Sequence, residues 1–124
     1  MDASNLDHER SKVMETAMQE IQQRIANALT GISGEDQQIL ATAGLKWVDL
    51  MLRKNRDYGS SAWKIPLLAP ELSAGSAIQV RMSDKIERLR SLLNKNPEIT
   101  DETIRDTVND LGAYCLLWLA RPAE

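Results

Sequence analysis

Three acidic residues recur every fourth position near the C-terminal end of the chain: Glu102, Asp106 and Asp110. A spacing of four places all three on one side of a helix, where like charges repel. Water, a divalent cation or a lysine from a neighbouring helix can offset that repulsion. The acidic stripe runs into the apolar stretch 111–120, which favours partial enclosure of Asp106 and Asp110; plain solvation is the alternative.

Two lysines occupy positions that suggest more than a solvated surface. Lys85 lies in the apolar stripe that Ile78 and Leu89 define on a predicted helix, and lysine is seldom buried without a partner. It either extends to the edge of the stripe or pairs with an acid of the last helix. Lys54 ends another predicted helix, where it either interacts with the helix dipole or binds a phosphate.

The segment 57–76 has no clear period, and a loop of about 20 residues in a compact domain is more often functional than idle. Tyr58 either stacks on a base or covers the core. Gly59 is suited to a backbone conformation that residues with a Cβ avoid.

The chain has one histidine, His8, and one cysteine, Cys115, so zinc ligation and Cys/His catalysis are poor fits. The sequence contains no glycine-rich phosphate loop. The chemistry left to the chain is that of carboxylates, which would hold a hard cation such as Mg²⁺ that acts on a phosphorylated substrate.

Apolar periodicity predicts an all-α, four-helix bundle-like fold that would position these residues. The second helix is apolar around more than half of its circumference, which predicts a central position. Thr100 is a candidate N-cap for the last helix, and Ile99 and Ile104 are placed as a hydrophobic staple. The four predicted helices cover approximately residues 6–29, 35–55, 76–93 and 101–120.

Length and composition narrow the class of protein. The 124 residues suffice for a single domain with a core, and a net charge of −3 argues against binding a nucleic-acid polymer. A single cysteine excludes a disulfide framework and favours a reducing cytoplasm. We expect no membrane segment, because no apolar stretch approaches the roughly 20 residues that span a bilayer, and no signal peptide.

Three blocks of sequence carry a family resemblance: KNRDYG at 54–59, DKIER at 84–88 and DETIRDTVNDLGAY at 101–114. Together they resemble the first of the nucleotide modification associated domains, a small helical family common in bacteriophages. That family is similar to the all-α nucleoside triphosphate pyrophosphohydrolases of the MazG and dUTPase type. The resemblance implies a nucleotide-binding core at 35–120 with a long loop between the second and third helices. The N-terminal helix, within 1–34, lies outside it. The resemblance also implies that the protein is encoded by a phage and lies in the cytoplasm of the host.

The pyrophosphohydrolases hold Mg²⁺ with acidic pairs on two successive helices and cut a nucleoside triphosphate to monophosphate and pyrophosphate. Asp84 and Glu87 match the first pair, with Asp in place of Glu, and the acids of the last helix stand where the second pair belongs. The resemblance therefore implies catalytic residues Asp84, Asp106 and Asp110; metal ligands Asp84, Glu87, Glu102, Asp106 and Asp110; and substrate-binding residues Lys54, Asp57, Tyr58, Gly59, Trp63, Lys85 and Arg88.

Three functions follow as hypotheses. The first is Mg²⁺-dependent pyrophosphohydrolysis of a (deoxy)nucleoside triphosphate. The second is a non-catalytic nucleotide binder or sponge, in which Lys85–Asp106 or Arg88–Asp110 would be structural ion pairs. The third is a helical protein-interaction module whose amphipathic first helix forms a dimer seam or enters a partner's groove. The resemblance also implies a homo-oligomer with segment 57–76 near the interface.

Overall fold

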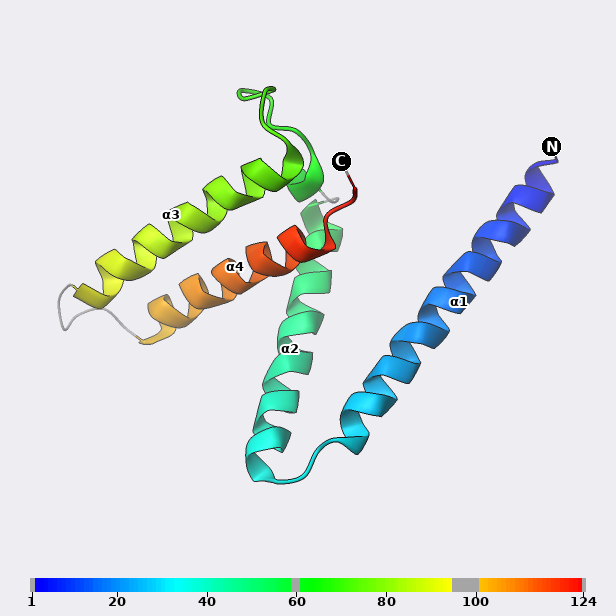
Figure 1. Ribbon diagram of the computed structural model, residues 1–124, viewed down its shortest axis with the longest axis horizontal. Helices are drawn as coiled ribbons and strands as arrows, with labels where there is room; N and C mark the ends of the chain where they lie inside the picture. Colours follow the sequence, from blue (N-terminus) through cyan, green and yellow to red (C-terminus); the bar gives the residue numbers. More distant parts are fainter. Residues whose placement is uncertain (1, 59–60, 95–100, 124) are drawn as a thin grey trace. The chain divides into compact units, whose positions relative to one another are not determined.

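The computed structural model describes residues 2–58, 61–94 and 101–123. Within these ranges the chain forms four α-helices, one short 3-10 helix and no strand, so the all-α prediction is confirmed (Figure 1). Thr100 and Ile99, predicted as cap and staple, lie outside the described residues. The elements are α1 (Ala3–Thr30), α2 (Glu35–Tyr58), η1 (Ser61–Trp63), α3 (Ala74–Asn94) and α4 (Asp101–Ala120).

The chain divides into two compact units, and the division falls inside α2. The N-terminal unit is Met1–Gly44, which holds α1 and the first part of α2. The C-terminal unit is Leu45–Glu124, which holds the rest of α2 together with η1, α3 and α4.

Helix α1 begins at a side-chain cap. Asp2 accepts a hydrogen bond from the backbone N–H of Ser4 at 3.2 Å and another from its hydroxyl at 2.8 Å, which satisfies one of the donors left free at a helix start. These hydrogen bonds lower the pKa of the Asp2 carboxyl. None of residues 3–30 is buried, so α1 has an apolar stripe without a core to cover it.

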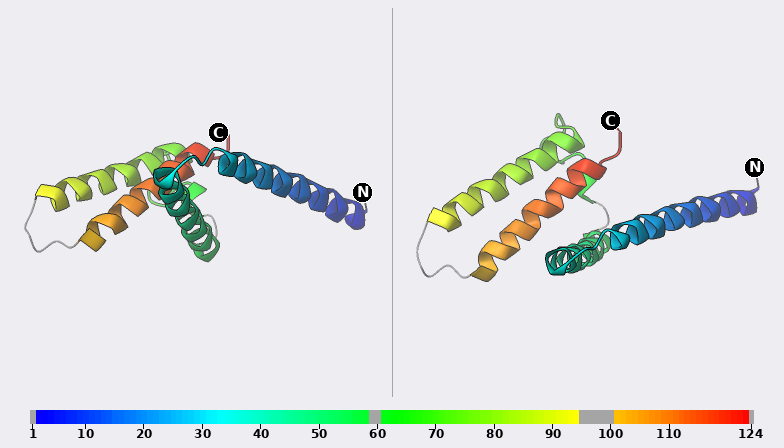
Figure 2. Two further views of the ribbon diagram at one scale, coloured as in Figure 1. Left: turned by 90° about the horizontal axis from the view of Figure 1, so that it is seen from below. Right: turned by 60° about the horizontal axis from the view of Figure 1, so that its bottom comes forward.

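The core of the C-terminal unit lies between α3 and α4, which run side by side in opposite directions (Figures 1 and 2). Small residues near the start of α3, Gly75 and Ala77, are buried with Ile78, and α4 contributes Thr107, which is 3 % exposed. The Thr107 hydroxyl donates to the backbone carbonyl of Thr103 at 3.1 Å, so burial leaves it hydrogen-bonded.

The segment between α2 and α3 is fixed to the core at two points. The indole N–H of Trp63 donates to the backbone carbonyl of Leu117 at 3.1 Å, one of the last four carbonyls of α4 that lack a partner within the helix. Ser73 caps α3 by accepting a hydrogen bond from the N–H of Ser76 at 3.1 Å. Between them, two turns place Leu67 and Leu68 in full contact with solvent.

Helix α2 meets α4 through an aromatic ring. A Cβ on Gly112 would lie 3.3 Å from Cζ2 of Trp47, so the ring rests directly against the backbone of α4. Elsewhere in the C-terminal unit α2 is more exposed than its composition predicts, and the expectation of an enclosed helix is wrong there. Its exposed large apolar residues are Ile39, Leu40, Leu45, Val48 and Leu52.

We predict opposite effects for substitutions at two helical glycines. A Cβ at Gly44 would meet nothing within 4 Å, so Gly44→Ala should stabilise the protein by about 0.5–1 kcal/mol through helix propensity. Gly112→Leu should displace Trp47 and cost about 1–3 kcal/mol. Denaturant unfolding of both variants measures the difference. Equal stability of the two would contradict the packing of Trp47 on α4.

Candidate functional site

Two lysines from different helices converge on one carboxylate in the C-terminal unit. Lys85 Nζ of α3 lies 3.3 Å from Oδ2 of Asp110, and Lys54 Nζ of α2 lies 3.7 Å from Oδ1 of the same residue. Each oxygen of the α4 carboxylate therefore faces one ammonium group. We call these three residues the lysine–aspartate cluster.

The members of the cluster differ in exposure in a way that follows from their helical positions. The Lys85 side chain keeps 27 % of its area exposed, Asp110 39 % and Lys54 51 %. Lys85 starts inside the apolar stripe of α3, so its ammonium group needs a partner. The prediction that it pairs with an acid of the last helix is confirmed, with Asp110 as the partner in place of Asp106.

The cluster carries a net charge of +1 and has unused donors. Each ammonium group has three N–H donors, and the pairing with Asp110 engages one group per carboxylate oxygen. Within the residues that the structure describes, Asp110 is the one ion-pair partner of Lys54 and Lys85, so their remaining donors can serve an anion with several acceptor oxygens. Phosphate is such an anion, and lysine binds it as a point charge.

The other predicted acids lie on exposed surface. Asp84, Glu87, Glu102 and Asp106 are all exposed, and Glu87 forms a surface ion pair with Arg90 at 3.5 Å. The predicted enclosure therefore holds for Asp110 and is wrong for Asp106. The stripe stays in water until it reaches the Lys85 side chain.

Mg²⁺ is held by several oxygen ligands at short distance. The described residues include no group of three or more His, Cys, Asp or Glu side chains placed to hold a metal ion. At the lysine–aspartate cluster the donor set is one carboxylate beside two ammonium groups, which suits an anion better than a cation. The five metal ligands named from the sequence stay predictions.

The remaining substrate-binding predictions have mixed positions. Asp57 and Arg88 are exposed. The Tyr58 side chain and all of Gly59 lie outside the described residues. Trp63 is half-buried and its indole N–H already has an acceptor in α4, which leaves the ring faces as the part that could contact a base.

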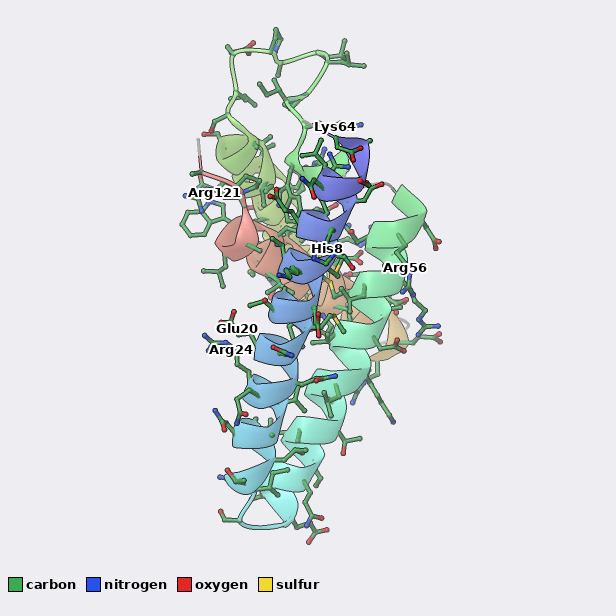
Figure 3. All side chains as sticks on the ribbon, turned by 90° about the vertical axis from the view of Figure 1, so that its right-hand side faces the viewer. His8, Glu20, Arg24, Arg56, Lys64 and Arg121 are labelled. Carbon is green, nitrogen blue, oxygen red and sulfur yellow. The ribbon has the colours of Figure 1, made fainter. Side chains whose placement is uncertain are left out.

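Sequence reasoning missed two contacts made by α4. Trp47 packs on Gly112, two residues beyond Asp110. At the end of α4 the guanidinium of Arg121 stacks 3.9 Å from the Trp118 ring centroid and donates to the Trp118 carbonyl at 2.7 Å (Figure 3). An i,i+3 cation and ring beside the helix end was the one available signal for this second contact.

We predict a measurable coupling within the cluster. A double-mutant cycle with Lys85→Met and Asp110→Asn should give about 0.5–1 kcal/mol, because both side chains are partly exposed and water screens the pair. High salt should reduce it. Asp106→Asn is the matched control, and its coupling with Lys85→Met should be near zero. Equal coupling for both acids would contradict the observed pairing.

Comparison of the chain with protein-family models, with curated proteins and with solved structures found no match. Among the helices in the described part of the chain, none is both long enough and apolar enough to cross a membrane.

Proposed function

We propose that the C-terminal unit binds a (deoxy)nucleotide through its phosphates, with Lys54 and Lys85 as the phosphate ligands. The observation that carries the proposal is the convergence of two ammonium groups from different helices on the single carboxylate of Asp110. Phosphate oxygens would accept hydrogen bonds from the donors that Asp110 leaves free.

Asp110 has a structural role in this proposal. Two unpaired ammonium groups near one another would repel, and the carboxylate between them offsets that repulsion. It also fixes two flexible side chains before the ligand arrives, which lowers the entropy that binding must overcome. The net positive charge that remains at the cluster attracts a phosphate chain.

The nucleoside part would lie toward the segment that joins α2 to α3. This placement follows from the sequence, because Lys54 is separated by three residues from Tyr58 and the same segment carries Trp63. The resemblance implies that these aromatic residues contact the base, and stacking on an aromatic ring tolerates different bases.

Mg²⁺-dependent pyrophosphohydrolysis is the second candidate, and the resemblance over 36–120 favours it. In that function Asp84, Asp106 and Asp110 would be the catalytic residues, with Glu87 and Glu102 as further ligands. The metal would supply charge neutralisation and an activated water. The ammonium groups around Asp110 favour binding over hydrolysis, because they compete with a cation for this carboxylate. The resemblance implies a homo-oligomer for both candidate functions.

We predict that a panel of common and modified deoxynucleoside triphosphates contains ligands that raise the melting temperature in the presence of EDTA. Lys85→Met should weaken the affinity of such a ligand by at least about tenfold, since a charge-assisted contact is lost. Lys54→Met should weaken it less, because that side chain is more exposed. Isothermal titration calorimetry measures each dissociation constant.

Lys46→Met is the matched control, because Lys46 is an exposed lysine of the same helix as Lys54 and lies outside the cluster. Its affinity should equal that of the wild type. Absence of a thermal shift with every nucleotide would overturn the proposal. If the wild type released pyrophosphate in the presence of Mg²⁺ and Asp110→Asn did not, the function would be hydrolysis and not binding alone.

A further inference from the structure

Helix α1 presents an apolar stripe that its own unit leaves uncovered. We call it the α1 stripe; its large side chains each keep between 42 and 71 % of their area exposed. Of residues 3–30, all of them described, none is buried. A solvated amphipathic helix gains most of its stability from packing of its apolar face, so this face calls for a partner. The stripe comprises Val13, Met14, Met18, Ile21, Ile25 and Leu29.

The spacing within the stripe is that of a coiled-coil seam. Met14, Met18, Ile21 and Ile25 of the stripe are followed by Ala28 on the same helix, so the intervals alternate between four and three residues as at a and d positions. This pattern fits another straight helix with the same repeat. Arg24 at the edge of the stripe pairs with Glu20 on its own helix at 3.0 Å (Figure 3), so its charge is already offset there.

We infer that a second copy of this chain covers the α1 stripe, through an antiparallel pairing of the two α1 helices centred near Gln23. In this register Met18 faces Ala28 of the other copy and Ile21 faces Ile25, so each of these seam residues meets an apolar side chain. In a dimer with a two-fold axis, each α1 stripe then covers the other in a single interface. The inference rests on the N-terminal unit alone and is independent of the proposed nucleotide site.

Charge and area support a second copy as the occupant. Helix α1 carries four acidic and three basic side chains with none in the stripe, so two copies would repel each other little. Antiparallel helices also place opposite dipole ends together. The exposed side chains of the α1 stripe together offer an area on the order of several hundred Å², which approaches the roughly 800 Å² per partner that a standard interface buries.

Analytical ultracentrifugation of the full chain between micromolar and submillimolar concentration tests the pairing. The wild type should sediment as a dimer. The double variant Ile21→Glu, Ile25→Glu should weaken dimerisation by at least about tenfold per substitution, because each places a carboxylate in the seam. The double variant Gln19→Glu, Ala26→Glu adds the same charge on the opposite face and should remain dimeric.

A monomeric wild type would overturn the inference and leave the stripe to another part of the chain or to another protein. Equal sedimentation of the two double variants would also overturn it. Because the glutamates could unfold α1, a second experiment uses conservative variants in a Cys115→Ala background. A mixture of Met18→Cys and Ala28→Cys chains should form a disulfide between unlike copies. Disulfides between like copies alone would overturn the antiparallel register.

Discussion

One carboxylate joins three helices of the C-terminal unit. Asp110 of α4 lies within ion-pair distance of Lys85 of α3 and of Lys54 of α2. Without it, Lys85 would carry an uncompensated ammonium group in the apolar stripe of α3. The same pairing leaves a net positive charge where the sequence alone suggests a row of acids, which favours an anion over a cation.

The packing around Asp110 explains why this acid, and not its neighbours, is engaged. Helices α3 and α4 are packed against each other, and Thr107, one turn before Asp110, is buried with its hydroxyl hydrogen-bonded within α4. Trp47 rests on the backbone at Gly112 and brings the last turns of α2 to the same part of α4. Asp106, one turn earlier on α4, is exposed, and the ring contact at Gly112 lies beyond its turn.

The two units raise different physical problems. The C-terminal unit has a buried core and a charged cluster at its surface, and the excess of ammonium groups over carboxylates in that cluster favours an anion. The N-terminal unit has a long helix with an exposed apolar seam, which is the arrangement expected of an association element. The proposed anion would complete the first unit and the proposed second copy of α1 would complete the other.

The sequence by itself determined the helices and the need of Lys85 for a partner. Periodicity and breakers such as Gly31 and Pro97 are local signals, and the observed helices begin and end within three residues of the predicted bounds. The partner of Lys85 was decided by tertiary structure, because Asp106 and Asp110 are one turn apart and equivalent in pattern. Only the packing of α3 and Trp47 against α4 separates an acid that meets two ammonium groups from one that stays in water.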